Sequence, residues 1–194
     1  EALRKAVGLL VEDGRRPNQE EMTAAFEAIL AGEGDPALIS AFLVSLRIRG
    51  ETSEDIVAGA RVMRARARTV VAPEGAIDTC GTGGDGANTF NISTAAALVA
   101  AGAGVTVAKH GNRSVSSKCG SADVLVALGV NVDAPKEVVE RCIREVGIGF
   151  LFAPRLHPAF KAVAGLRREL AVRTVFNLLG YEAPADYLAP LITF

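Results

Sequence analysis

Residues 78–123 read DTCGTGGDGANTFNISTAAALVAAGAGVTVAKHGNRSVSSKCGSAD. Two loops rich in glycine and hydroxyl side chains frame one apolar helix-and-strand unit. No acidic residue lies between Asp85 and Asp123, whereas three cations do: Lys109, Arg113 and Lys118. Glycine lets main-chain N–H groups approach oxyanions closely, and helix N-termini add partial positive charge. The stretch therefore predicts a binding site for a highly phosphorylated small molecule.

Around this stretch the pattern alternates between β-rich and helical segments, beginning at Val70. We expect β-rich segments at 77–80, 105–109 and 148–152. Helical segments are expected between them, at 93–101, 122–128 and 135–146. Strands that alternate with helices through short glycine-rich joints favour a parallel sheet with crossover helices. We predict an α/β domain over residues 69–156.

The first 68 residues instead predict a helical domain. Capping signals precede three of its helices: Asn18 with Glu21, Asp35 with Pro36, and Thr52 with Asp55. Helical patterns return over residues 157–180, and we expect those helices to join the N-terminal ones. The predicted fold class is thus a helical domain plus a parallel-sheet α/β domain.

Composition limits the function. The net charge of −1 argues against a surface for nucleic acid or anionic membranes. The longest apolar run, 94–107, is interrupted by glycines and too short to span a bilayer. Cys80, Cys119 and Cys142 lack the spacing of zinc ligands. We interpret them as reduced thiols of a cytoplasmic protein, with a nucleophilic cysteine as the alternative, because Cys80 and Cys119 flank the loops.

The motif GTGGDG at 81–86 matches the dinucleotide fingerprint G-x-G-x-x-G. That fingerprint also needs an acid about 20 residues later, and residues 106–109 contain none. Asp85 would repel a bare pyrophosphate, but a metal-bridged phosphate or a sugar tolerates it. A Walker loop is excluded because no G-K-[ST] follows the glycines.

Two further motifs favour an anion. NIST at 91–94 stands where a helix should begin, with more polar residues than a cap needs. KHGNRSVSS at 109–117 follows a predicted strand, and open α/β sheets bind ligands at the carboxyl ends of their strands. Arg167, Arg168 and Arg173 come later, and any one of them is suited to a substrate carboxylate.

Together these residues resemble the anthranilate phosphoribosyltransferases, which share a fold with the pyrimidine nucleoside phosphorylases. The motifs, in the family's order, are GTGGDG at 81–86, NIST at 91–94, KHGNRSVSS at 109–117 with GSAD at 120–123, and HPAF…LRREL…RTVFNLLG over 157–180. The resemblance covers residues 1–180. It implies a homodimer and the family's small helical domain.

The resemblance implies that a phosphoribosyl group passes from phosphoribosyl pyrophosphate (PRPP) to the amine of anthranilate, in tryptophan biosynthesis, with Mg²⁺ as cofactor. The implied PRPP-binding residues are Gly81, Gly84, Asp85, Thr89, Asn91, Ser93, Thr94, Lys109, His110, Gly111, Asn112, Arg113, Ser114, Ser116, Ser117 and Ser121. Anthranilate would contact Gly81, Asn112 and Arg167, and Ser93 would also reach Mg²⁺. No residue is assigned as acid or base, because the carboxylate of anthranilate can assist proton loss from its own amine.

The sequence departs from the family pattern in several places. Family members run beyond this length, so we expect a chain truncated after about residue 180. The family's Asp-Glu pair for Mg²⁺ has no counterpart, since no Asp-Glu dipeptide occurs. Gly165 replaces a usual proline and Ala171 a usual glycine. Residues 181–194, YEAPADYLAPLITF, match nothing in the family.

Two alternatives therefore stay open. A chain that binds PRPP without turnover fits the lack of the Mg²⁺ carboxylates. A nucleoside phosphorylase-like enzyme would bind nucleoside and phosphate, although KHGNRSVSS argues against it.

Overall fold

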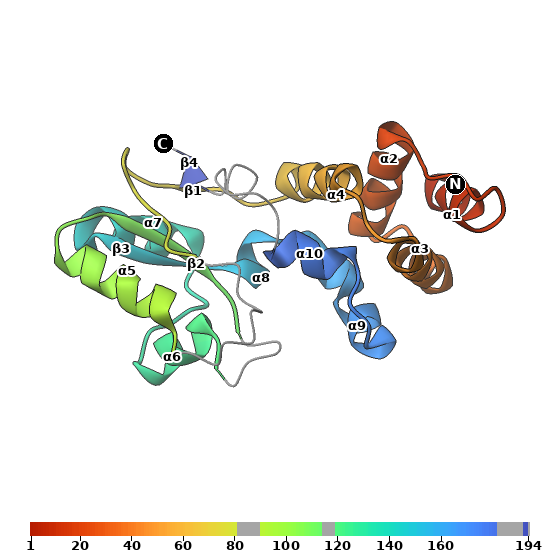
Figure 1. Ribbon diagram of the computed structural model, residues 1–194. Helices are drawn as coiled ribbons and strands as arrows, with labels where there is room; N and C mark the ends of the chain where they lie inside the picture. Colours follow the sequence, from red (N-terminus) through yellow and green to blue (C-terminus); the bar gives the residue numbers. More distant parts are fainter. Residues whose placement is uncertain (81–89, 114–118, 182–191, 194) are drawn as a thin grey trace. The chain divides into compact units, whose positions relative to one another are not determined.

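A computed structural model describes residues 1–80, 90–113, 119–181 and 192–193 of the chain (Figure 1). The described residues form two compact units. One contains Glu1–Ala67 and the helices that begin at His157, and the other contains Arg68–Leu156 and the strand at 192–193. One unit is helical and the other combines parallel strands with helices, so the predicted fold class is confirmed.

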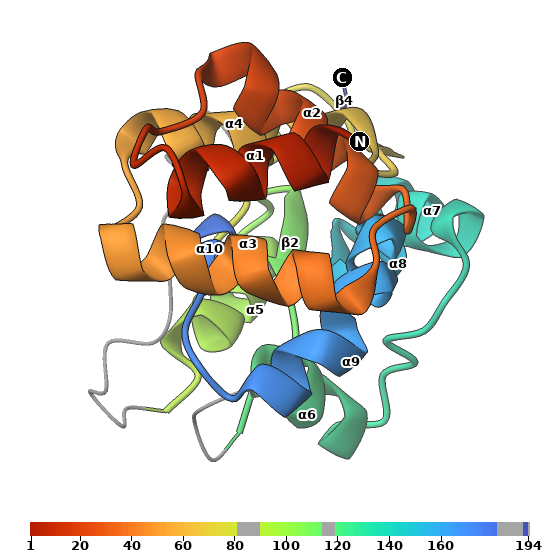
Figure 2. The same ribbon diagram turned by 90° about the vertical axis from the view of Figure 1, so that its right-hand side faces the viewer.

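The helical unit comprises α1 (Ala2–Val11), α2 (Gln19–Leu30), α3 (Pro36–Arg49), α4 (Ser53–Ala65), a short 3-10 turn η1 (Pro158–Phe160), α9 (Lys161–Leu170) and α10 (Val175–Tyr181). Its core is apolar and includes Val163 and Phe176 from the late helices. The ring of Phe26 meets those of Phe42 and Phe176 edge to face, with centroids 5.7 and 5.9 Å apart. Figure 2 shows α1 and α3 side by side in this unit.

The helices begin where the capping signals predict. At α2, the Asn18 side chain accepts the Glu21 N–H at 2.9 Å, while the Glu21 carboxylate accepts the Asn18 N–H. Thr52 and Asp55 make the same reciprocal pair at α4. Asp55 is also buried and forms an ion pair with Arg16. One carboxylate thus caps a helix and ties it to the segment before α2.

The α/β unit comprises β1 (Val70–Val71), α5 (Ile92–Gly102), β2 (Val107–Gly111), α6 (Ser121–Ala127), α7 (Lys136–Val146), β3 (Ile148–Phe152), α8 (Ala153–Leu156) and β4 (Ile192–Thr193). Strands β2 and β3 pair in parallel from Val107 opposite Ile148 to Gly111 opposite Phe152. A second parallel pair joins β1 to β4, with Val70 opposite Ile192.

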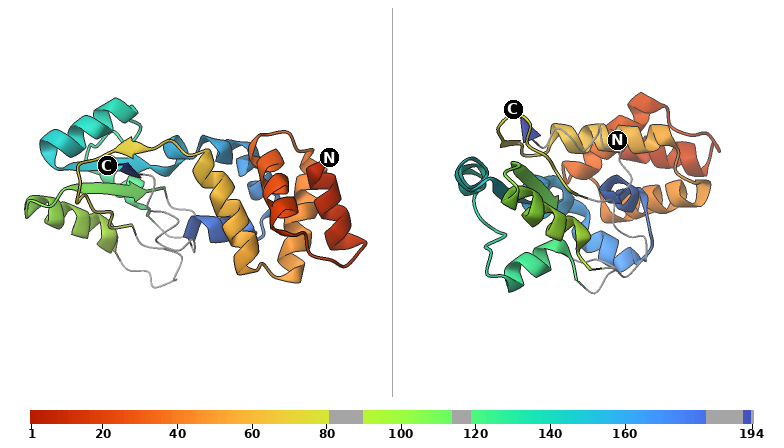
Figure 3. Two further views of the ribbon diagram at one scale, coloured as in Figure 1. Left: turned by 90° about the horizontal axis from the view of Figure 1, so that it is seen from above. Right: turned by 60° about the vertical axis from the view of Figure 1, so that its left-hand side comes forward.

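Helices cover the β2–β3 pair, with α7 packed against β3 and α5 against β2 (Figures 1 and 3). Gly149 permits the close approach of α7, since a Cβ there would stand 2.5 Å from Cγ1 of Ile143. Among the described residues, no helix is long and apolar enough to cross a membrane.

The expected strand over 77–80 does not form. Ile77 makes a single isolated parallel bridge to Val107, and residues 78–80 are outside any strand. The reason is a side chain: the Asp78 carboxylate accepts backbone N–H groups that a ladder would otherwise use. Local side-chain hydrogen bonds of this kind compete with sheet pairing.

Candidate functional site

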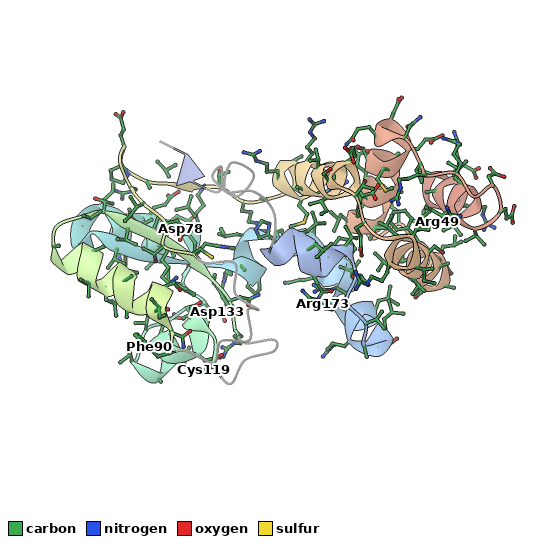
Figure 4. All side chains as sticks on the ribbon, viewed as in Figure 1. Arg49, Asp78, Phe90, Cys119, Asp133 and Arg173 are labelled. Atoms are coloured by element: carbon green, nitrogen blue, oxygen red, sulfur yellow. The ribbon has the colours of Figure 1, made fainter. Side chains whose placement is uncertain are left out.

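Asp78 joins the starts of the two glycine-rich loops. Its Oδ1 accepts the backbone N–H of Cys80 at 2.8 Å and that of His110 at 3.1 Å. Partial desolvation raises the pKa of the Asp78 carboxyl, and the hydrogen bonds from His110 and Cys80 oppose that rise. Figure 4 shows Asp78 in the α/β unit beside the strands. Asp78 is not among the predicted site residues. Its position directly after Ile77, at the end of an apolar segment, is the sequence feature that could have indicated it.

Lys109 brings a positive charge to the start of α5. The residue is only 3% exposed, and its Nζ donates to Ser93 Oγ at 3.2 Å. Burial lowers the pKa of Lys109, while the nearby Cys80 and Asp78 oppose this shift. The ammonium and the helix N-terminus are both positive, so an anion placed between them would be stabilised by both.

Two hydroxyl side chains complete this corner of the unit. Thr79 Oγ1 donates to the Ser93 carbonyl oxygen at 2.8 Å and so fixes the first turn of α5 to the segment after Ile77. Thr94 is buried, and its Oγ1 has no hydrogen-bond partner among the described residues. A buried hydroxyl without a partner is costly, and a bound phosphate oxygen would satisfy it.

The second loop is held by Ser121, the first residue of α6. Its Oγ accepts the Asn112 N–H and donates to the Asn112 carbonyl, both at 3.2 Å. Gly111 makes this possible, because a Cβ there would lie 2.2 Å from Ser121 Oγ. Arg113 forms an ion pair with Asp123 at 3.2 Å. The backbone of this loop is therefore positioned by α6.

A weaker contact joins α5 to the second loop. Asn91, the residue before α5, donates from Nδ2 to the carbonyl oxygen of Cys119 at 3.4 Å. Asn91 is the first residue of the NIST motif, and Cys119 lies between KHGNRSVSS and GSAD. The first motif therefore contacts the segment that links the other two.

Arg167 belongs to a different unit from the other described site residues. It lies on α9 of the helical unit, with its Cζ 5.8 Å from the centroid of the Phe160 ring. His157 also packs edge to face on Phe160, and burial lowers the pKa of this histidine. The Phe160 ring thus contacts both the Arg167 guanidinium and the His157 imidazole.

The structure brings together, on adjoining segments of the α/β unit, the predicted site residues Asn91, Ser93, Thr94, Lys109, His110, Gly111, Asn112, Arg113 and Ser121. Their role in binding a ligand stays a prediction. Outside the described residues lie Gly81, Gly84, Asp85, Thr89, Ser114, Ser116 and Ser117.

Two domain families match the chain. Residues 73–185 match the α/β domain of a glycosyl transferase family, and residues 10–67 match the helical bundle domain of a glycosyl transferase family. The α/β match runs through η1, α9 and α10, although Val163 and Phe176 of this stretch lie in the helical core.

Curated relatives and solved structures agree with these families. An anthranilate phosphoribosyltransferase of Anaeromyxobacter sp. (strain Fw109-5) is 68% identical over 82% of this chain and 48% of its own length. One of Rhodospirillum rubrum is 60% identical over 91% of this chain and 51% of its own. The chain thus spans about half the length of the curated relatives it matches.

Among solved structures, anthranilate phosphoribosyltransferase from Thermus thermophilus has a TM-score of 0.79 and 46% identity, covering 98% of this chain and 60% of that one. The Saccharomyces cerevisiae enzyme in complex with PRPP and Mg has a TM-score of 0.82 and 29% identity, covering 98% of this chain and 55% of that one.

Proposed function

Since the chain belongs to the glycosyl transferase family with these helical bundle and α/β domains, we propose that it acts in anthranilate phosphoribosyl transfer. PRPP is the donor, the amine of anthranilate is the acceptor, and pyrophosphate leaves. The curated relatives with 60% and 68% identity carry this activity in their names.

The contact between Lys109 and Ser93 is the observation that carries the proposal. A buried ammonium 3.2 Å from a hydroxyl in the first turn of a helix forms a corner suited to an anion. The Oγ1 of buried Thr94, which has no hydrogen-bond partner within the described part of the chain, adds a hydroxyl at the same helix start. In transfer from PRPP the sugar becomes cationic and the leaving group strongly anionic, so catalysis depends on positioning and electrostatic stabilisation. Lys109 and the α5 N-terminus supply the positive charge for that leaving group.

The second loop holds the rest of the donor. Ser121 fixes both backbone polar groups of Asn112, and Asp123 holds the Arg113 guanidinium. Residues 109–113 therefore approach the ribose and phosphates with a backbone that is already ordered. Gly81, Gly84, Asp85, Thr89, Ser114, Ser116 and Ser117 remain part of the proposed PRPP site by their motifs.

The described residues fit a magnesium ion that is held largely through its substrate. Mg²⁺ usually keeps several waters and binds substrate phosphates together with few protein oxygens. The Ser93 hydroxyl beside Lys109 is one such oxygen. The Thr94 hydroxyl, without a partner among the residues that the structure describes, lies in the same turn of α5. When bound, Mg²⁺ neutralises charge on the departing pyrophosphate.

The acceptor side of the proposal uses Asn112 and Arg167, with Gly81. A planar guanidinium pairs with a carboxylate through two parallel hydrogen bonds, and Arg167 carries the only guanidinium assigned to anthranilate.

We also propose a cytoplasmic homodimer. The family resemblance supports the homodimer, and three cysteines outside any disulfide support the cytoplasm.

Anthranilate fluorescence tests the proposal on the full chain with Mg²⁺ and PRPP. A PRPP-dependent loss of fluorescence at enzymatic rates, matched by pyrophosphate release, is the expected result. A folded chain that gives neither signal would refute transfer. PRPP binding without turnover would instead favour the alternative of a binding chain.

A further inference from the structure

Three side chains with metal-ligating atoms meet at one end of β2. They are Asp78 and Cys80, from the segment after Ile77, and His110 from β2. One ligand atom from each lies within 4.8 Å of the others, and Cys80 Sγ is 3.9 Å from His110 Nδ1. The sequence hides this cluster, because Cys80 and His110 become neighbours only through the pairing of Ile77 with Val107.

The distance between Cys80 Sγ and His110 Nδ1 suits two ligands of a tetrahedral zinc centre. Zn–S and Zn–N bonds of about 2.3 and 2.1 Å at a tetrahedral angle place sulfur and nitrogen about 3.6 Å apart. The observed 3.9 Å needs only a small adjustment. A thiolate, an imidazole and a carboxylate are ligands that Zn²⁺ accepts, whereas Mg²⁺ prefers oxygen alone.

Hydrogen bonds already hold the backbone of the cluster before any metal binds. Asp78 Oδ1 accepts the backbone N–H groups of both Cys80 and His110, so one carboxylate orients the backbone of the two other ligands. An ionised carboxylate has about four lone-pair sites on its two oxygens, which leaves capacity for a metal. Asp78 and Cys80 are exposed, which provides an entry path for an ion.

The charges balance. The Cys80 thiolate and the Asp78 carboxylate together offset a divalent cation, so the nearby Lys109 ammonium faces a neutral centre. A like-charge contact with Lys109 would otherwise oppose binding.

We propose that Asp78, Cys80 and His110 form a binding site for a zinc-class divalent cation, with three protein ligands and a fourth position for water. On binding, the Sγ–H bond of Cys80 is replaced by an Sγ–metal bond, and the proton passes to the buffer. None of the three ligands is Ser93, the residue proposed for Mg²⁺. His110 is shared with the proposed PRPP site, but the evidence for the metal site does not use the proposed function.

Titration of the full chain with Co²⁺ tests the site, because thiolate ligation gives a sulfur-to-cobalt charge-transfer band. We expect this band at one Co²⁺ per chain, with its loss on addition of Zn²⁺. The Cys80→Ser variant should lack the band. The Cys119→Ser and Cys142→Ser variants should keep it, since these cysteines lie outside the cluster.

His110→Gln is the second variant, and it should weaken Co²⁺ binding by about tenfold or more while circular dichroism stays unchanged. Absence of the thiolate band in the folded parent chain would overturn the proposal. So would a band that persists in Cys80→Ser, or unchanged affinity in His110→Gln. None of these readouts involves PRPP or anthranilate, so they are independent of the transfer assay.

Discussion

Lys109 is a buried cation at the start of α5, within the proposed anion site. Burying an ammonium is expensive unless it is paired or hydrogen-bonded, and Lys109 is 3% exposed with Ser93 Oγ as a partner. Burial lowers the pKa of Lys109, because desolvation penalises the charged ammonium. A phosphate oxygen at Nζ would offset that cost.

Replacing Lys109 with methionine therefore tests the anion corner at similar side-chain volume. Charge-assisted hydrogen bonds contribute about 1.5–3 kcal/mol, so Lys109→Met should weaken PRPP binding by roughly 10- to 100-fold. Calorimetric titration measures the affinity, and Lys136→Ala, an exposed lysine paired with Glu140 on α7, is the matched control. Unchanged affinity in Lys109→Met would remove this residue from the site.

Arg167→Ala should weaken the use of anthranilate, the acceptor, without changing the binding of PRPP, the donor. If Arg167 pairs with the anthranilate carboxylate as proposed, its loss should raise the KM for anthranilate about tenfold or more, while the Kd for PRPP should stay unchanged. The adjacent, exposed Arg168→Ala is the control. Equal losses for anthranilate and PRPP would contradict a role limited to the acceptor.

For single residues, the role of the predicted polar side chains in binding stays a prediction, while the structure shows how these side chains are connected. Ser93, Lys109 and Asn112 stand in motifs whose composition already indicates an anion site. The double hydrogen bond of Asp78 and the cluster it forms with Cys80 and His110 were missed. The bond from Cys80 to Asp78 is local, but the bond from His110 and the cluster itself join segments about 30 residues apart, which no local pattern encodes.

Among the elements, helix starts were predictable because capping is local. Asn18 with Glu21 and Thr52 with Asp55 satisfy each other within one turn. The expected strand over 77–80 was wrong because the Asp78 side chain takes backbone N–H groups away from the ladder. Strand pairing depends partly on distant contacts, such as the one between Asp78 and the His110 N–H, and is therefore harder to predict.

The end of α9 offers a test of element stability. Ala171 adopts φ +51°, a left-handed conformation, as the C-cap of α9. A non-glycine residue there costs about 1–2 kcal/mol, so Ala171→Gly should raise the free energy of unfolding by about 1 kcal/mol. Ala164→Gly, inside the same helix, should lower it by about 1 kcal/mol. Urea denaturation compares the two, and a loss of stability in Ala171→Gly would contradict this account.

The whole molecule depends on pairings across long separations. Strand β1 pairs with β4 through Val70 and Ile192, although residues 181–194 showed no recognisable pattern in the sequence. Val163 and Phe176 join the core of the first four helices. The class of each unit was predictable from periodicity, but this pairing between β1 and β4 was not.

Stability of the chain should depend on pH through Glu21. The Asn18 backbone N–H, with Arg15 and Lys5 beside it, lowers the pKa of Glu21 from 4.5 to about 2. A lowered folded-state pKa adds stability above the unfolded value and loses it as pH falls from about 4.5 toward 2. Glu21→Gln should thus be less stable than the parent at pH 7, with the difference shrinking at acid pH.

Urea denaturation at several pH values measures this difference, and the exposed Glu20→Gln is the control. A difference between Glu21→Gln and the parent that stays constant from pH 7 to acid pH would show that the charge of Glu21 is not what stabilises the start of α2.

PRPP is proposed to bind at the strand ends and the α5 N-terminus of this chain. Calorimetric titration of the full chain with PRPP in the presence of Mg²⁺ tests it most directly. We expect saturable binding of one PRPP per chain, weakened in Lys109→Met. A folded chain that shows no PRPP binding would contradict it.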